Sequence, residues 1–197
     1  MDATALAISG GWAVGTRTYA TLLVLGVLGR TGLADVPEFL ERAEALIVVG
    51  VLAVIEVVAD KIQFVDSLWD TVHVAVRPIV AGVIGWSAAA DAASLAQAVT
   101  ALVAGGTALL AHGGKAGTRL AVNAFPGTVP NATISVAEDV LVIGVLLLAS
   151  QHAWMGAVVA GALVVASLAL GAALTPRVRR GWHVLRQRYF AAEDAPP

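Results

Sequence analysis

The segment from Glu56 to Arg77 places seven ionisable side chains between two long apolar runs. The runs, residues 43–59 and 72–90, are each long enough to cross a bilayer or nearly so. A charge at the centre of a membrane helix costs about 2.5–3.5 kcal/mol on insertion scales, so such groups are rare and are usually paired or functional. The segment therefore predicts a membrane protein with a polar site. The seven side chains are those of Glu56, Asp60, Lys61, Asp66, Asp70, His73 and Arg77.

The composition agrees with a membrane environment. Hydrophobic residues make up 58% of the 197 residues and charged residues only 13%, whereas a soluble domain carries about 25% charged residues. The net charge of −2 excludes a nucleic-acid binder driven by bulk electrostatics. Because the chain has no cysteine, disulfides and thiolate metal sites are excluded as well. We expect no cofactor, and membrane lipids are the first expected partners.

Six apolar segments are expected to be membrane helices, which gives an all-α polytopic fold. Glycines interrupt the first segment at Gly10, Gly11 and Gly15, and residues 113–117 follow the fourth. Such clusters indicate broken or re-entrant helices, which membranes tolerate where protein or water satisfies the backbone. The alternative is close packing of helices through small residues. The six segments are residues 3–28, 43–59, 72–90, 95–112, 136–150 and 154–174.

Short matches relate the two halves of the chain. The sequence Gly-Thr-Arg occurs at residues 15–17 and 117–119, and Gly-Val-Leu occurs at residues 50–52 and 144–146. Three crossings per half is an odd number, so a duplicated unit must be inverted relative to its copy, as in many transporters. The sequence thus predicts two inverted three-segment repeats. They cover about residues 3–91 and 94–175 of a transmembrane domain that spans residues 1–176.

Basic residues predict the orientation. The tail, residues 177–197, holds five arginines, whereas the loops near Asp91 and His152 hold no Lys or Arg. The positive-inside rule places this tail in the cytoplasm, and six crossings would place the N-terminus there too. Apolar residues recur at helical spacing between the arginines, so we expect a basic amphipathic helix on the membrane surface, followed by a disordered end.

Three acidic motifs have structural as well as functional interpretations. Asp66 and Asp70 lie four residues apart and could hold a divalent cation on one helix face, but Ser67 with Asp70 also resembles a helix cap. Ser135 and Glu138 form a capping-box sequence before an apolar run. A charge at Asp139 would suit the first turn of the same helix. The sequence does not specify which metal ion Asp66 and Asp70 would hold.

The remaining charges are harder to explain as caps. Glu56 lies deep in its segment, and Arg17 and Arg119 each lie two residues after a glycine. They could form buried ion pairs that only stabilise the fold, or line a polar cavity. We favour the second interpretation because several charges converge where lipid penalises each one. The predicted substrate- or ion-binding residues are Arg17, Glu56, Asp60, Lys61, Asp66, Asp70, Arg77, Lys115, Arg119, Asn123, Glu138 and Asp139; no catalytic residue is expected.

The order of these motifs resembles a known family. The pattern G-x-R, E-x-x-x-D-K, D-x-x-x-D, R-P, K-x-x-x-R, N and S-x-x-E-D is similar to that of the multi-pass proteins called domain of unknown function 4126. The resemblance runs from about Gly10 to Leu148. One departure is Gln63, where the family pattern has a proline after Asp-Lys-Ile. The resemblance implies a small protein of paired repeats in the bacterial inner membrane, and it implies no activity.

The function expected from the residues is that of a small transporter or channel, not of an enzyme. An ion or small charged solute would pass near the membrane midplane between the repeats. One alternative is a structural or assembly protein with buried ion pairs. A weaker alternative is a magnesium-dependent enzyme acting on lipid phosphate through Asp66, Asp70 and Asp139. Small residues around Gly82, Gly85, Gly156, Gly161 and Gly171 also predict a homodimer.

Overall fold

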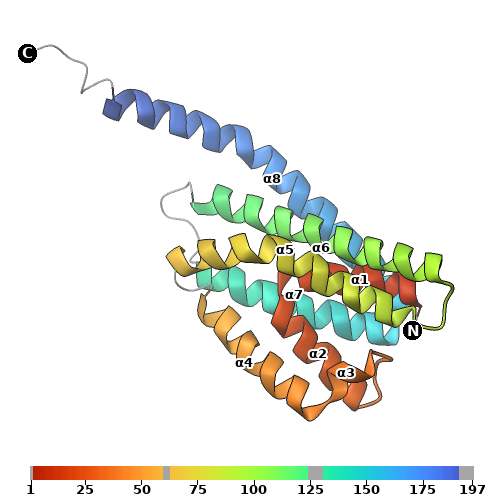
Figure 1. The fold of residues 1–197 in the computed structure, drawn as a ribbon. Helices are drawn as coiled ribbons and strands as arrows, with labels where there is room; N and C mark the ends of the chain where they lie inside the picture. Colours follow the sequence, from red (N-terminus) through yellow and green to blue (C-terminus); the bar gives the residue numbers. More distant parts are fainter. Residues whose placement is uncertain (1, 60–62, 124–130, 191–197) are drawn as a thin grey trace, which may run out of the picture.

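The structure of this chain is a computed structural model that describes residues 2–59, 63–123 and 131–190. These residues form α-helices with no strand among them, which confirms the all-α prediction. Helices α5, α6, α7 and the first half of α8 run along one common direction (Figure 1). The helices are α1 (Ala3–Thr16), α2 (Thr18–Arg30), α3 (Glu38–Glu41), α4 (Ala43–Ala59), α5 (Gln63–Ala88), α6 (Ser94–Asn123), α7 (Asn131–Gln151) and α8 (Ala153–Phe190).

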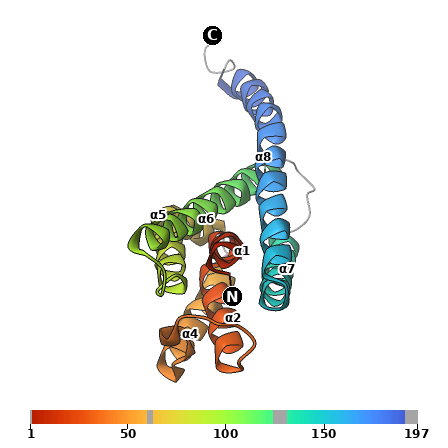
Figure 2. The same cartoon turned by 90° about the vertical axis from the view of Figure 1, so that its right-hand side faces the viewer.

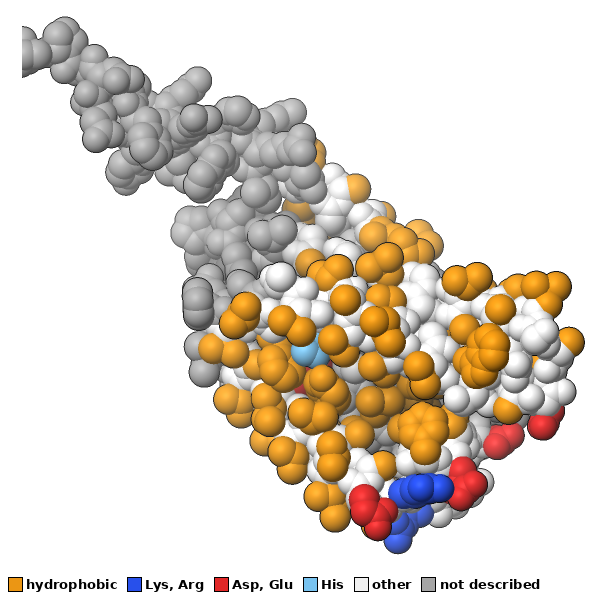
Figure 3. All heavy atoms as spheres, in the orientation of Figure 1, with side chains coloured by type: hydrophobic (Ala, Val, Ile, Leu, Met, Phe, Trp, Pro, Cys, Tyr) orange, Lys and Arg blue, Asp and Glu red, His pale blue; other side chains and the backbone are white. Residues whose placement is uncertain are grey.

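Four helical stretches in the described part of the chain are long and apolar enough to cross a membrane. Large apolar side chains point outward along them: Leu95 and Leu102 are each 75% exposed and Val158 is 69% exposed. Apolar side chains cover most of the face seen in Figure 3, while charged ones gather at the end near α3. A surface of this kind is stable against lipid and not against water. The four stretches are Leu68–Ala88, Ser94–Arg119, Thr133–Gln151 and Ala153–Leu174.

Helix α1 lies at the centre of the bundle, where it contacts α5, α6, α7 and α8 (Figure 2). Two glycines let it approach α6. A Cβ atom on Gly11 would lie 3.1 Å from the Cα of Ala104, and one on Gly15 would lie 2.7 Å from the Cα of Ala108. Helix α1 is continuous across both glycines. The prediction that they break the segment is therefore wrong, and they serve close packing instead.

Helices α1 and α2 form a re-entrant hairpin. Since Gly11 faces Ala104 and Gly15 faces Ala108, α1 runs in the same direction as α6. Helix α2 then turns back, and residues 32–35 after it line a cavity together with residues 149–153 at the α7–α8 turn. The N-terminus, the loop after α2, the α5–α6 loop and the α7–α8 turn thus lie at one end of the bundle, here called the loop end (Figure 1).

The hairpin changes the predicted topology. Residues 3–28 do not cross the bundle once, because α1 has only 14 residues and α2 has 13. Helix α8 leads away from the loop end, so the N-terminus and the last turns of α8 lie at opposite ends (Figure 1). The prediction that both termini face the cytoplasm is not confirmed by this arrangement. Helix α4 has 17 residues, the lower limit for a spanning helix, so six crossings are not confirmed.

The predicted inverted repeats are not confirmed either. The two Gly-Thr-Arg sequences lie on α1 and α6, which run in the same direction, whereas an inverted pair requires opposite directions. Helix α6 is also continuous through residues 113–119, so the expected break there is absent. Helix α8 continues past Pro176 to Phe190, which makes the predicted tail helix an extension of the last segment.

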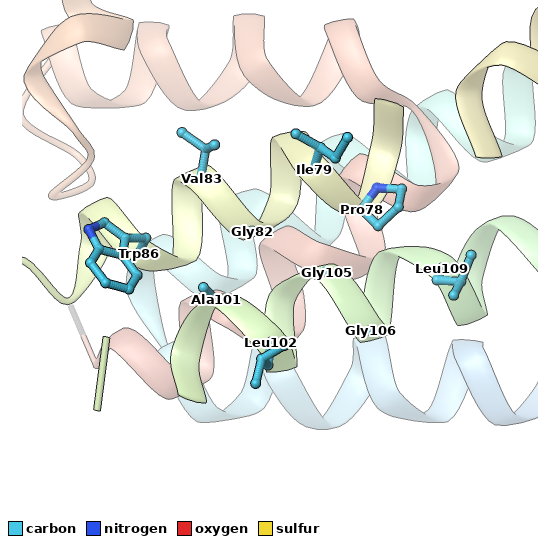
Figure 4. A pocket seen from close by; sticks show the side chains of 10 residues that line it. All are labelled: Pro78, Ile79, Gly82, Val83, Trp86, Ala101, Leu102, Gly105, Gly106 and Leu109. Atoms are coloured by element: carbon cyan, nitrogen blue, oxygen red, sulfur yellow. The ribbon is translucent and has the colours of Figure 1, made fainter. Parts of the chain in front are cut away.

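An apolar groove of about 670 Å³ lies between α5 and α6 (Figure 4). Its wall contains Gly82, Gly105, Gly106 and Trp86, and no charged side chain lines it. The small glycines allow the two helices to leave this space open on the lipid-facing side. The groove is therefore apolar, and the described charged side chains lie elsewhere.

Candidate functional site at the α1–α2 break

The α1–α2 hairpin bends at Arg17, whose extended backbone (φ −144°, ψ 97°) separates the two helices. The sequence has no proline or glycine at this position. A break inside a bundle leaves backbone carbonyl groups of the first helix and N–H groups of the second without helical partners. Such groups cost several kcal/mol each when they stay unpaired in lipid. Side chains from other helices satisfy them here.

The carbonyl groups at the end of α1 all have donors. The Ala13 oxygen accepts from the Arg17 N–H at 2.7 Å, and the Val14 oxygen accepts from the Thr18 hydroxyl at 3.1 Å. The last two carbonyl groups bind cationic side chains of α5 and α6. Arg77 donates to the Gly15 oxygen at 2.8 Å, and Lys115 donates to the Thr16 oxygen at 2.9 Å. Two cations thus lie at the negative end of the α1 dipole, where they are favoured.

The N–H groups at the start of α2 converge on one carboxylate. Glu56, on α4, accepts hydrogen bonds from the backbone of Thr18 at 3.0 Å, Tyr19 at 3.1 Å and Ala20 at 3.4 Å. The N–H of Thr21 binds the Arg17 oxygen at 3.1 Å. Glu56 is only 1% exposed, so its charge is compensated by these donors and by the positive end of the α2 dipole.

Arg17 itself points toward the start of α7. Its Nε lies 3.0 Å from the Asp139 carboxylate, and its Nη2 donates to the Ser135 backbone oxygen at 3.0 Å and to the Ser135 hydroxyl. Glu138 lies beside it and meets three cations through one oxygen. Its Oε2 is 3.0 Å from the Nζ of Lys115, 3.5 Å from Arg119 and 3.6 Å from Arg17.

A second group of charges surrounds Arg77, which is fully buried. Its Nη2 lies 3.3 Å from Asp70 and 4.0 Å from Glu56. Its Nη1 donates to the Nδ1 atom of His112 at 2.6 Å, so the proton of this imidazole resides on Nε2. Arg77 therefore links the end of α1 to residues from α4, α5 and α6. A single guanidinium has enough N–H groups to make these contacts at the same time.

Three aromatic rings lie beside the start of α2. The rings of Trp69 and His73 stack at 4.6 Å, and the Tyr19 ring meets both of them edge-on. The Nδ1 atom of His73 lies 2.7 Å from the Trp69 backbone oxygen, so it carries the proton. Its Nε2 can then accept from the Tyr19 hydroxyl at 3.3 Å. These rings therefore pack against one another next to the N–H groups that bind Glu56.

The comparisons with known proteins agree with this arrangement of motifs. The model of the family described as Domain of unknown function (DUF4126) matches residues 4–172. The chain belongs to this family. No curated protein and no solved structure matches the chain. The family resemblance found in the sequence is thereby confirmed, and the match covers nearly all of the re-entrant hairpin and of the four spans.

In this DUF4126 member, the structure brings together eight of the twelve predicted site residues. Four of these eight residues are basic and four are acidic, so their charges balance. Each of the four carboxylates lies within 4.0 Å of a basic group. Arg119 is the last residue of its span, whereas Arg77 lies near the middle of the span Leu68–Ala88, so the cluster reaches from the middle of the bundle toward the end opposite the loop end. The eight residues are Arg17, Arg77, Lys115 and Arg119 with Glu56, Asp70, Glu138 and Asp139.

The other four predicted residues cannot be placed in the site. Asp60 and Lys61 lie outside the described residues. Asp66 and Asn123 are on described helices, but their side chains are not among those described. Within the described part of the chain, no three His, Cys, Asp or Glu side chains are grouped as metal ligands. The two carboxylates of the proposed magnesium site that are described, Asp70 and Asp139, each face an arginine instead.

The predicted caps are wrong. Helix α5 begins at Gln63 and α7 begins at Asn131, so Ser67 and Ser135 lie inside helices and not before them. Ser135 and Glu138 instead bind cations of other helices. The capping-box spacing of Ser135 and Glu138 is a local sequence pattern. In the folded chain, contacts with cations of other helices replace the expected capping contacts.

Sequence reasoning missed two residues of the site. His112 was not among the predicted site residues, but it is 3% exposed and binds Arg77. Tyr19 was not considered, yet its backbone N–H binds Glu56 and its ring contacts His73. A weak signal existed for His112, because it lies three residues before Lys115, on the same face of a helix.

Proposed function

We propose that this protein is a small transporter or channel for an ion or small charged solute, with its polar site at the α1–α2 break. The observation that supports the proposal is the pair of helix ends inside the bundle, one offering carbonyl oxygens and the other N–H groups. Discontinuous helices of this kind bind substrates and coupling ions in membrane transporters, through their dipoles and their free backbone groups.

For a solute to bind at this helix break, it must displace a side chain that now binds the free backbone groups. In the described structure, Glu56 occupies the N–H groups of α2, while Arg77 and Lys115 occupy the last carbonyl oxygens of α1. An anion could replace the Glu56 carboxylate, and a cation could replace one of the two basic side chains. The solute would therefore enter by competing with a side chain of the same charge sign.

Ion flux in proteoliposomes tests the proposal. We expect flux of at least one member of a panel of cations and anions for the wild type, and strongly reduced flux for Glu56→Gln and Arg119→Ala. Arg42→Ala is the matched control, because Arg42 is exposed at the loop end and pairs only loosely with Glu38, at 3.9 Å. Absence of flux for every tested ion, with all three variants folded, would contradict transport.

A structural or assembly role is the second candidate, and a specific observation favours it. Every free backbone group at the break has a protein partner, and the described charges are balanced. Buried charges of this kind can serve only to fix helix packing. The enzyme alternative has less support, since Asp70 and Asp139 pair with different arginines.

We also propose an orientation for this topology. The five arginines of residues 177–197 favour a cytoplasmic position for the end of α8 in the bacterial inner membrane. The N-terminus and the loop end would then face outward, together with Asp35, Glu38 and Asp91. The loop end is predominantly acidic, which agrees with the positive-inside rule.

Self-association is a further part of the proposal. Of the glycines from which a homodimer was predicted, Gly85, Gly156 and Gly171 pack within the chain, against α6, α7 and α6 respectively. A Cβ atom on Gly161 would have nothing within 4 Å. The dimer contact would therefore lie at Gly161 on α8, where a second helix could approach closely.

A further inference from the structure

A cavity of about 330 Å³ lies between α1, α6, α7 and α8. Most of its wall is apolar, including Trp12 and Leu163. Leu141 on α7 and Leu170 on α8 also line it and are 45% and 47% exposed, so the cavity is accessible from the lipid. Its volume is near the lower limit for small-molecule sites, which are roughly 300–1,000 Å³. The cavity thus suits a small, largely apolar molecule of the membrane.

Two charged side chains line this cavity, and they neutralise each other. The Nζ atom of Lys115 lies 3.0 Å from the Oε2 atom of Glu138, and it also donates to the Thr16 backbone oxygen at 2.9 Å. A charged ligand group beside this neutral pair would lose its hydration in apolar surroundings and would have no counter-charge of its own. The cavity therefore favours a ligand without net charge.

The hydrogen-bonding capacity that the wall offers to a ligand consists of acceptors. The ion pairs of Glu138 with described side chains all use its Oε2 atom, so its Oε1 atom is available as an acceptor. The hydroxyl groups of Thr16, Thr118 and Ser167 each donate to a backbone oxygen of their own helix at 2.9 Å, and they keep only lone pairs for a ligand. The polar group of a ligand must therefore donate a hydrogen bond.

We infer that this cavity binds a neutral single-chain amphiphile whose polar end is a hydroxyl group, such as a long-chain alcohol. The hydroxyl group donates to the Oε1 atom of Glu138, and a hydrogen bond to a carboxylate is stronger than one between neutral groups. The hydrocarbon chain lies along Trp12, Leu141 and Leu163. One chain is favoured over the two chains of a diacyl lipid because the volume is small. The site is independent of the transport proposal, because it needs binding and no flux.

Quenching of Trp12 fluorescence tests this inference directly, because Trp12 lines the cavity. The purified protein in nanodiscs is titrated with octadecanol dibrominated in mid-chain, with the methyl ether of this alcohol, and with the corresponding stearate. The ether has the same chain but no donor, and the stearate carries an anionic carboxylate in place of the hydroxyl group. The Trp12 signal is the difference between the wild type and Trp12→Phe. We expect saturable quenching by the alcohol and only linear, partition-type quenching by the other two probes.

Substitutions in the wall complete the test. Ala166→Phe should abolish saturable quenching, because Ala166 lines the cavity, while Ala172→Phe, exposed on the same helix and outside the wall, should leave it unchanged. Glu138→Gln should weaken binding of the alcohol roughly fivefold and leave the ether unchanged, since a neutral acceptor makes the weaker hydrogen bond. Circular dichroism shows whether each variant is folded.

Three outcomes would overturn the inference. Equal quenching by the alcohol and its methyl ether, or unchanged quenching in folded Ala166→Phe, would exclude the site. Saturable quenching by the stearate and not by the alcohol would exclude a neutral donor as the polar end. Saturable quenching by a dibrominated diacylglycerol would exclude the single-chain assignment.

Discussion

The carboxylate of Glu56 on α4 accepts a hydrogen bond from the backbone N–H of Thr18 on α2, at 3.0 Å and across 38 residues of sequence. Helix α2 has no side-chain cap from its own N-cap residue, Arg17. Its first turn therefore depends on a residue from another helix, whereas most helices are capped by a neighbour in sequence. The start of α2 can form only when α4 is packed against it.

This dependence predicts a large effect of Glu56 on stability. Glu56→Ala should lower the free energy of unfolding by about 3–5 kcal/mol, since it leaves Arg77 and three N–H groups without their buried carboxylate. Glu56→Gln keeps one oxygen acceptor but loses the charge, so about 1–3 kcal/mol is expected. Denaturant titration in mild detergent, followed by circular dichroism, measures both values.

The control for Glu56 is Glu44→Gln, on the exposed surface of the same helix. Its effect should stay within about 0.5 kcal/mol. Equal losses for Glu56→Ala and Glu44→Gln would show that Glu56 does not cap α2.

The membrane class and the composition of the charge cluster could be predicted from the sequence, because both depend on which residue types lie in apolar segments. Which charged residues pair with one another could not be predicted. Arg17 and Asp139 are 122 residues apart, and no local pattern relates them. Ser135 and Glu138 have the spacing of a capping box, but α7 begins four residues before Ser135, at Asn131. Local motifs near buried charges therefore gave wrong helix starts.

The hairpin was missed for a related reason. Residues 3–28 are apolar throughout, and hydropathy cannot distinguish one crossing from two half-crossings. The three glycines suggested a break, but the chain bends two residues later, at Arg17. The bend is set by Arg77, Lys115 and Glu56, which satisfy the backbone there. These contacts come from three other helices and are invisible in a local window.

The close approach of α1 and α6 predicts opposite effects for two glycine substitutions. Gly15→Ala should destabilise the protein by about 1–3 kcal/mol, since its Cβ atom would lie 2.8 Å from the Cβ of Ala111. Gly106→Ala should stabilise by up to about 1 kcal/mol, because nothing lies within 4 Å and alanine favours helix. Thermal unfolding in detergent compares the two. Similar shifts of both midpoints in one direction would contradict the packing argument.

A charge swap separates the structural role from transport. Arg17→Asp alone should destabilise by about 3–5 kcal/mol, because Asp139 and Glu138 would face a third carboxylate. Adding Asp139→Arg restores the charge balance, so the double variant should recover part of the loss, with a coupling energy of about 1–3 kcal/mol. Recovery of stability without recovery of flux would support transport.

Gly161 on α8 tests self-association. Gly161→Leu should shift the mass of the detergent-solubilised protein from dimer to monomer, because the larger side chain prevents close approach of two α8 helices. Its circular dichroism should stay unchanged, since nothing in the chain lies within 4 Å of the new Cβ atom. Light scattering gives the mass. A wild type that is already monomeric in several mild detergents and in nanodiscs would contradict the dimer.

The re-entrant hairpin makes the sharpest topological prediction. The chain has no cysteine, so single cysteines can be introduced at Thr4, Asp91 and Leu185 without other changes. Because α1 and α2 enter and leave at the loop end, positions 4 and 91 should react with a membrane-impermeant maleimide from the same side. Position 185, beyond the last span, should react only from the other side. If residues 3–28 crossed once, position 4 would be labelled together with 185, and the hairpin would be wrong.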